Sequence, residues 1–257
     1  MRPVAELSAD LRGVFSDIDD TLTHNGVVDL EAYTALLKAR AAGLRVVLVT
    51  GRPAGWAEVL ASVWPVDAAI AENGGIAYLK RNGRLERIYF DPGDPADDAR
   101  RLAVLADEIV RTFSFARRSD DCTLRITDLA FDIGEHQHLP AAEIDALTSR
   151  CRELGARTLV SSVHAHAFFH TADKAKMSAR VANVLWGEAP ADVAAHYAFV
   201  GDSPNDQAAF AFFDASIGVA NVARYAADLK PAPSYVTPSP NGHGFAEAIE
   251  AILGRRP

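Results

Sequence analysis

The sequence predicts an α/β fold built on a parallel sheet, and three observations support that prediction. Short apolar runs alternate with segments of helical period in the first ninety residues, which is the pattern of strand–helix–strand units. A stretch with longer strand-like runs and shorter connections follows, and the first pattern returns near residue 172. We therefore expect a Rossmann-like core domain at residues 1–90 and 172–257, interrupted by an inserted α+β cap domain at residues 91–171.

The elements of the core follow from hydrophobic period and from capping residues. The run from Leu44 to Val49 is nearly continuous and β-branched, as expected for a parallel strand buried on both faces. Gly43 before it suits the end of a helix, and Pro53 after it suits the first turn of another. The expected core strands are 13–19, 44–49, 68–71, 198–200 and 216–219. The expected core helices are 30–42, 53–63, 173–185, a short one after 204, and 245–253.

A hairpin and a cap sheet complete the expected organisation. Asn82-Gly83 is a favoured dipeptide for a tight turn, and it separates the strand-like runs 76–80 and 85–90. In the cap we expect an antiparallel sheet that carries helices on one face. Its strands would be 123–133, 158–163 and 166–171, and its helices 95–112 and 141–154. The acids of this segment are expected in turns or on a solvated strand face: Asp120, Asp121, Asp128 and Asp132.

Composition and charge exclude several classes of protein. The 257 residues are 49% hydrophobic and 23% charged, which excludes disorder as the main state. The net charge of −8 disfavours nucleic-acid binding, because an acidic chain repels the phosphate backbone. Cys122 and Cys151 are too few for a disulfide framework. With no secretory signal and no apolar stretch long enough for a membrane, we expect a cytoplasmic protein without a membrane partner, and the sequence gives no signal for an oligomeric state.

The strongest chemical signal follows the first expected strand. Asp17 and Asp19 lie two residues apart in DIDDTL. Because the carboxyl ends of parallel strands form the ligand crevice, both side chains can be aimed at one point. Two close carboxylates repel each other unless a cation or a proton intervenes, and hard oxygen ligands suit Mg²⁺. The alternative interpretation is an exposed acidic turn.

Three further motifs stand at equivalent strand-to-helix turns. Thr50 and Gly51 can seat a phosphate with a hydroxyl and free amides, although Thr50 could equally cap the next helix. The sequence GDSPND adds Asp202 and Asp206 to the same edge, and the alternative is a turn with a helix cap. Lys174 stands at a helix start, where a positive charge is unfavourable unless it counters an anion such as phosphate. The alternative is a solvated surface lysine.

Taken in this order, the four motifs resemble those of the haloacid dehalogenase-like superfamily of phosphotransferases. The matching segments are DIDDT at 17–21, Thr50-Gly51, Lys174 and GDSPND at 201–206. The insertion lies between the second and third motifs, where the type IIB (Cof-like, sugar-phosphatase-like) subgroup carries an α/β cap. The segment AENGG at 71–75 also resembles that subgroup. The cap itself is similar to the subgroup in position and pattern only.

The resemblance implies a Mg²⁺-dependent phosphatase that acts on a small phosphorylated metabolite, such as a sugar phosphate or a phosphoglycolate-like acid. Asp17 would be the nucleophile that forms an aspartyl-phosphate, and Asp19 would be the general acid and then the general base. The residues that would hold Mg²⁺ are Asp17, Asp19 through its backbone carbonyl, Asp202 and, nearby or through water, Asp206. The residues that would bind the phosphoryl group are Thr50, Gly51, Lys174 and Asn205, the last by orienting Lys174 or the phosphate.

Two other functions remain open beside hydrolysis. A phosphomannomutase-like phosphotransferase would keep the aspartyl-phosphate and return the phosphoryl group to a sugar. A phospho-accepting signalling domain also places acids, a Thr and a Lys at strand ends, but such domains are much shorter. They also lack a second acid two residues after the phosphorylated one, so Asp19 and the cap argue against that alternative.

The specificity signal lies in the cap and is weaker. His164, His166 and His170 are spaced to project from one face of an extended segment. Three interpretations remain: ordinary partly exposed histidines, a metal site, and contact with substrate. In the last, a turn near 163–165 would place His164 and His166 on a loop that faces the crevice of the core.

Overall fold

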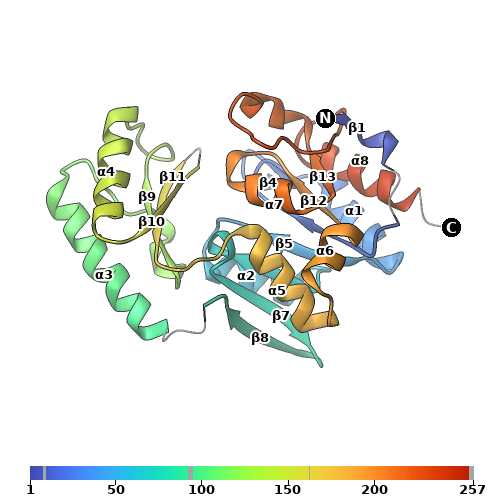
Figure 1. Cartoon of the computed structure of the whole chain (residues 1–257), viewed down its shortest axis with the longest axis horizontal. Helices are drawn as coiled ribbons and strands as arrows, with labels where there is room; N and C mark the ends of the chain where they lie inside the picture. Colours follow the sequence, from blue (N-terminus) through green and yellow to red (C-terminus); the bar gives the residue numbers. More distant parts are fainter. Residues whose placement is uncertain (8–9, 92–94, 162, 255–257) are drawn as a thin grey trace.

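A nine-stranded sheet forms the centre of the larger part of the molecule (Figure 1). The computed structural model describes residues 1–7, 10–91, 95–161 and 163–254. The strand order is β1-β14-β13-β12-β2-β5-β6-β7-β8, parallel from β1 to β6 and antiparallel in β7 and β8. The strands are β1 (Arg2–Pro3), β2 (Gly13–Ser16), β5 (Arg45–Val49), β6 (Ala68–Ala71), β7 (Ile76–Arg81), β8 (Arg84–Tyr89), β12 (Tyr197–Gly201), β13 (Ala215–Gly218) and β14 (Tyr235–Val236).

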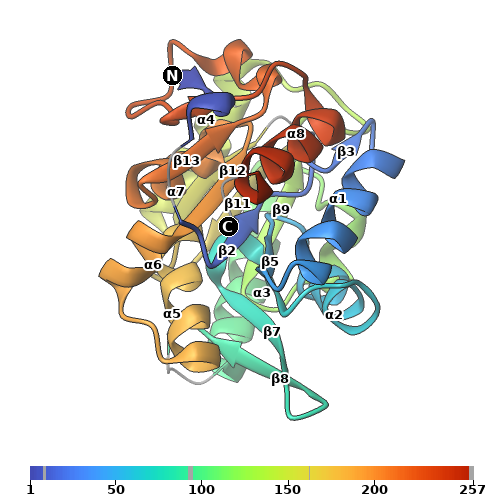
Figure 2. The same cartoon turned by 90° about the vertical axis from the view of Figure 1, so that its right-hand side faces the viewer.

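Helices cover both faces of this sheet, as Figure 2 shows. Side chains of α1, α2 and α8 pack on one face, and those of α5, α6 and α7 pack on the other. These helices are α1 (Leu30–Ala41), α2 (Ala54–Val63), α5 (Lys174–Trp186), α6 (Pro190–His196), α7 (Gln207–Phe212) and α8 (Asn241–Leu253). Along β2 the alternation of a strand sends Val14 to the first layer and Phe15 to the second. The predicted α/β class is therefore confirmed.

Local signals placed most of these elements correctly. The expected hairpin is β7–β8, and its turn residues Asn82 and Gly83 have φ of 52° and 72°. Both angles lie in the left-handed region that such a turn requires. The Pro-rich stretch 231–240 contains strand β14, which lies between β1 and β13. The two-stranded sheet of β3 (Thr23–His24) and β4 (Val27–Val28), the edge strand β1 and helix α6 were not predicted.

A second, three-stranded sheet of order β10-β11-β9 lies beside the core. Its antiparallel strands are β9 (Asp128–Asp132), β10 (Arg157–Val160) and β11 (His164–Phe168). Helices α3 (Pro95–Thr112) and α4 (Ala141–Glu153) pack on one of its faces around Phe131 and Ala165. An antiparallel sheet with helices on one face is thus confirmed. We call residues 95–168 the cap segment.

The chain enters and leaves the cap segment at neighbouring points. The amide of Thr171 donates to Asp91 Oδ2 at 2.9 Å, and the Thr171 hydroxyl donates to Asp91 Oδ1 at 3.1 Å. Residues 92–94 of the first connection lie outside the described part of the chain.

Three expectations for the cap segment were wrong. The strand expected at 123–133 begins only at Asp128, because Asp120–Leu124 forms a 3-10 helix. Asp128 and Asp132 are buried instead of solvated. Asp132 accepts hydrogen bonds from three backbone amides, those of residues 134–136. The hairpin turn lies before residue 164, so that His164 and His166 lie on strand β11 and not on a loop.

Three further features relate to the cysteines, to helix length and to the last helix. Cys122 is partly buried, Cys151 is buried, and neither forms a disulfide. Among the described residues, no helix combines the length and the apolar character that crossing a membrane would require. Helix α8 begins at Asn241, four residues before the expected start at Phe245.

Candidate active site

Three adjacent parallel strands bring the sequence motifs to one edge of the sheet. Strand β2 pairs with β12 on one side and with β5 on the other. Asp17, Asp202 and Thr50 are the residues that directly follow β2, β12 and β5. Lys174 is the first residue of α5. The expected convergence at the carboxyl ends of the strands is therefore present.

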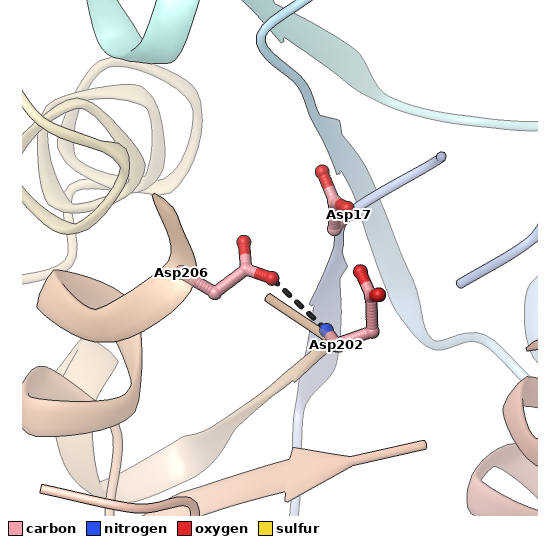
Figure 3. A group of neighbouring side chains, drawn as sticks. All are labelled: Asp17, Asp202 and Asp206. Carbon is pink, nitrogen blue, oxygen red and sulfur yellow. Dashed lines mark hydrogen bonds between the residues drawn. The ribbon is translucent and has the colours of Figure 1, made fainter. Parts of the chain in front are cut away.

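Three buried carboxylates lie together at this edge (Figure 3). One oxygen from each of Asp17, Asp202 and Asp206 lies within 4.8 Å of the others. The ammonium group of Lys174 donates to Asp17 Oδ1 at 2.7 Å and to Asp206 Oδ1 at 2.6 Å. Lys174 is itself fully buried, so the alternative of a solvated surface lysine is wrong.

The charges in this cluster do not balance. Burial raises the pKa of Asp17 well above its ordinary value, and Asp206 and Asp202 raise it further, against the opposing effect of Lys174. Burial and the carboxylates of Asp206 and Asp20 raise the pKa of Asp202 to about 7. Burial alone would lower the pKa of Lys174, but the Asp17 and Asp206 carboxylates hold it above its usual value. Three carboxylates thus face one ammonium group, and a divalent cation with hard oxygen ligands fits the remaining charge.

Asp206 binds both the loop that carries Asp202 and the side chain of Lys174. Its Oδ2 accepts from the amides of Asp202 at 3.0 Å and of Ser203 at 3.2 Å, while its Oδ1 accepts from Lys174. A Cβ at Gly201 would collide with Asp206 Oδ2, so glycine is required there. Asp206 therefore fixes both the loop that carries Asp202 and the position of the lysine.

Asp19 lies apart from the buried cluster. Its side chain is 41% exposed and forms a bidentate ion pair with Arg52, whose Nε and Nη2 donate at 2.9 to 3.1 Å. The Arg52 guanidinium stacks over the Trp56 ring at 4.9 Å from the centroid. No role for Arg52 is predicted from the sequence.

The other expected phosphate-binding residues surround the cluster. Thr50 is buried, and its Oγ1 accepts from the Arg52 amide at 2.9 Å. Gly51 lines the cavity described below. Asn205 Oδ1 accepts from the Ser203 hydroxyl at 2.8 Å. Asp17 and Asp206, rather than Asn205, make the hydrogen bonds that orient Lys174.

A cavity of about 530 Å³ separates the cluster from the cap segment. Its core side includes Asp17, Asp19 and Arg52, and its cap side includes His164 and His166. A volume of this order is typical of sites for small molecules. The two histidines therefore face the crevice, as the substrate-contact interpretation required. They do so from strand β11 and not from the expected loop.

A network of charges orients His166. Its Nδ1 lies 2.8 Å from Asp128 Oδ2, and Arg125 Nη1 donates to both oxygens of Asp128 at 2.8 and 3.0 Å. Burial favours the neutral acid, but Arg125 and His166 lower the pKa of Asp128 to about 2. The ionised Asp128 accepts a hydrogen bond from the Nδ1–H group of His166, so that Nε2 of His166 is available to a ligand.

The remaining histidines make different contacts. His164 Nε2 lies 3.0 Å from Glu135 Oε2, and the rings of His164 and His166 are 5.8 Å apart. His170 stacks on Phe168 at 4.4 Å. Within the described ranges, the three buried aspartates are the residues that form a metal-binding group, and the histidines do not join in one. The structure thus gives no support to the histidine metal site.

Two asparagines contribute to the site and were missed. Asn221 Nδ2 donates to Asp202 Oδ2 at 2.9 Å and to the carbonyl of Asp20 at 3.0 Å. Asn241 Nδ2 donates to the carbonyls of Asp20 and Thr23. Asp20 has a φ of 55°, a left-handed conformation that these bonds stabilise. No local motif marks either asparagine, since only the fold brings them to the turn after Asp17.

Comparison with known proteins agrees with the family that the motifs resemble. A sequence profile of haloacid dehalogenase-like hydrolases matches residues 14–111. The phosphoglycolate phosphatase of Archaeoglobus fulgidus is 29% identical over 243 residues, which cover 94% of this chain and 96% of that protein. Over residues 14–111 the chain is similar to the haloacid dehalogenase-like hydrolases, in agreement with the resemblance of the four motifs. The α+β cap segment lies between the second and third motifs, where the resemblance to the type IIB subgroup predicted it, and the name of this relative agrees with the predicted phosphatase class.

Solved structures share the fold of this chain. A crystal structure of a Thermoplasma acidophilum protein superposes with a TM-score of 0.75 at 18% identity, covering 95% of this chain and 98% of that one. The sucrose-phosphatase of Synechocystis sp. PCC6803, solved with sucrose and phosphate, gives a TM-score of 0.66 at 17% identity, with 95% and 98% coverage. At such identities these matches show the architecture alone.

Proposed function

We propose that this hydrolase is a Mg²⁺-dependent phosphatase of a small phosphorylated acid, and that phosphoglycolate is the first substrate to test. The observation that carries the proposal is the buried Asp17, held by Lys174 beside Asp202 on the floor of a small-molecule cavity. The relative named phosphoglycolate phosphatase supports the acid, while a sugar phosphate remains the alternative substrate. The proposal includes the expected division into a core at 1–90 and 172–257 and a cap at 91–171.

The acidic cluster would hold the metal. Asp17 and Asp202 would bind Mg²⁺ together with the Asp19 carbonyl, and Asp206 would support it by fixing the Asp202 loop. When bound, Mg²⁺ would offset the negative charge that develops on the phosphoryl oxygens. Lys174 Nζ, the Thr50 hydroxyl and the amide of Gly51 would add donors for those oxygens, with Asn205 at the cavity rim.

The chain's own residues account for both chemical steps. One carboxylate oxygen of Asp17 attacks phosphorus and forms an aspartyl-phosphate, while the bond to the leaving oxygen breaks. Asp19 gives that oxygen a proton, and then takes a proton from the water that attacks phosphorus and breaks the bond to Asp17. Inorganic phosphate leaves and both carboxylates are restored. Since Arg52 pairs with Asp19 in the structure, the pair must loosen before Asp19 can carry the proton.

The cap histidines would contact the part of the substrate beyond phosphorus. Substituting His166→Gln should raise the KM for phosphoglycolate by roughly tenfold, the effect of about one charge-assisted hydrogen bond, with a smaller change in kcat. The matched control is His196→Gln, at a partly exposed histidine of α6 that lies outside the cavity. Equal KM values in the two variants would remove His166 from the substrate site. Steady-state phosphate release measures both parameters.

The stabilisation by Mg²⁺ should depend on pH. The pKa of Asp202 rises from an ordinary value of 3.8 to about 7 in the metal-free fold, and that of Asp17 shifts in the same direction. Between those pH values the folded chain holds a proton that the unfolded chain has lost, so stability falls as pH rises. Mg²⁺ relieves the same repulsion. The increase in Tm on adding Mg²⁺ should therefore be larger at pH 8 than at pH 5, as thermal unfolding with chelator as reference would show. A larger increase at pH 5 would contradict this account.

The proposed function is tested by phosphate release from a panel of phosphoglycolate, hexose phosphates and simple alkyl phosphates, with Mg²⁺ and with chelator. Metal-dependent release from phosphoglycolate, lost with chelator, is the expected result. Release from hexose phosphates alone would contradict the proposal of a phosphorylated acid as substrate, but it would still support a phosphatase. Without release from any compound, transfer to a sugar would indicate the mutase, and a stable aspartyl-phosphate would indicate the signalling domain.

A further inference from the structure

Glu72 is a buried acid at the boundary between the core and the cap segment, and no step above uses it. It follows strand β6, in the segment AENGG, and has a φ of 52°. Its side chain is fully buried. A left-handed conformation at a non-glycine residue is uncommon, and such positions are often found at functional sites.

Five donors surround this one carboxylate. From the core, the amide of Ala54 at the start of α2 donates to Oε1 at 2.8 Å. From the cap segment, the amide of Ile126 donates to Oε1 at 2.9 Å, and the Asp128 amide donates to Oε2 at 3.1 Å. The amide and the hydroxyl of Thr127 both donate to Oε2 at 2.5 Å. All these partners are donors, so an ionised carboxylate fits the position.

The same stretch of the cap segment touches two loops of the core. Arg125 Nη1 donates to the carbonyl of Gly51, in the loop after β5, at 3.2 Å. Thr127 packs on Gly75, where an added Cβ would collide with its Oγ1. Residues 125–128 therefore rest on the loop that carries Thr50 and Gly51 and on the loop that carries Glu72.

The contact continues into the cavity. Asp128, whose amide Glu72 binds, accepts from His166 through its carboxylate. His166 lines the cavity opposite Asp17. Three links thus connect a core loop to the cap side chain that faces the substrate: Glu72 to the Asp128 backbone, Asp128 to His166, and His166 to the cavity.

We propose that Glu72 is a positioning residue that clasps residues 125–128 of the cap to the core and thereby holds the Asp128–His166 pair over the reacting phosphoryl group. The role of the pair in substrate binding rests on the proposed function, whereas the clasp itself rests on the contacts alone. Opening of the cap requires all four cap donors to leave Glu72. A carboxylate with five donors can therefore favour the closed arrangement without touching substrate.

Glu72→Gln tests the clasp. Glutamine has nearly the same shape, but its NH2 group is itself a donor and cannot accept hydrogen bonds from the donors that surround Glu72. Burial and Asp128 raise the pKa of Glu72 to about 7, against the effect of its donors, so the measurements belong at pH 8. The first readout is hydrogen exchange of the backbone amides at 125–128. Exchange there should become faster by about tenfold or more, while exchange in the core strands stays unchanged. The matched control is Glu86→Gln, at a half-exposed carboxylate of hairpin β7–β8.

The second readout separates positioning from general structure. In Glu72→Gln the KM for the hydrolysed substrate should rise by about tenfold with a smaller loss of kcat, and inhibition by inorganic phosphate, which binds the core, should not change. If Glu72→Gln does not fold, Thr127→Val removes one donor of the same clasp and should still speed exchange at 125–128.

The outcomes are distinct. Unchanged exchange at 125–128 in a folded variant would overturn the clasp, whatever the activity, because that readout needs no substrate. Faster exchange with an unchanged KM would overturn the link to His166. Absence of phosphatase activity in the unsubstituted chain would count against the proposed function and leave the exchange test intact.

Discussion

Asp17→Asn is expected to reduce phosphate release by about a thousandfold or more while the fold remains intact. The amide lacks the negative oxygen that attacks phosphorus, so no aspartyl-phosphate can form. The substitution also removes one of three crowded carboxylates, and the pKa of Asp17 is raised by burial. Thermal stability without metal should therefore hold or increase. Steady-state phosphate release and thermal unfolding measure the two effects.

The matched control for this variant is Asp97→Asn, at an exposed acid in the first turn of α3. It should keep full activity. A trapped phosphoenzyme in the unsubstituted protein, absent from Asp17→Asn, would identify the nucleophile directly. Activity within tenfold of the unsubstituted protein would mean that another residue attacks phosphorus.

Lys174→Met is expected to have the largest effect on stability. It leaves three buried carboxylates without their one cation, since Lys174 bridges Asp17 and Asp206. Breaking a buried ion pair costs roughly 3–5 kcal/mol, which for a chain of this size lowers Tm by about 10 °C. Mg²⁺ should restore part of the loss, because it supplies positive charge to the same carboxylates. Thermal unfolding with Mg²⁺ and with chelator gives the comparison.

Lys176→Met is the matched control for that experiment. Lys176 lies two residues further along α5, is half-exposed and pairs with Asp173. Its loss should move Tm by only a degree or two, as for other surface ion pairs. Equal changes in Tm for the two substitutions would show that the contribution of Lys174 to stability does not depend on its burial.

The sequence was most informative where local chemistry decides the structure. The dipeptide Asn82-Gly83 predicts a tight turn from its own conformational preference. The apolar run 44–49 predicts a buried strand from its composition, without knowledge of its neighbours. The cluster of Asp17, Asp202 and Asp206 could be foreseen because these residues lie in segments that follow parallel strands, and parallel strands end on one edge. That argument needs only the order of the elements, not their side-chain contacts.

Residues whose roles depend on distant partners could not be foreseen in the same way. Arg52 directly follows the Thr50-Gly51 motif, yet its pairing with Asp19 depends on how two loops face each other. Asp128 looked like a solvated acid because its partners Arg125 and His166 meet it only in the folded cap. Asn241 lies in an Asn-Gly-His-Gly stretch typical of a turn, but it begins helix α8.

The double hydrogen bond between Asp91 and Thr171 has a consequence for how such a molecule can change. It brings together the two connections that join the cap segment to the core. The cap segment therefore leaves and rejoins the core at neighbouring points, as a surface loop does. A connection of a few residues could join these points without moving any strand of the sheet. The cap segment could therefore be exchanged for another module while the strands that carry Asp17, Thr50 and Asp202 keep their register.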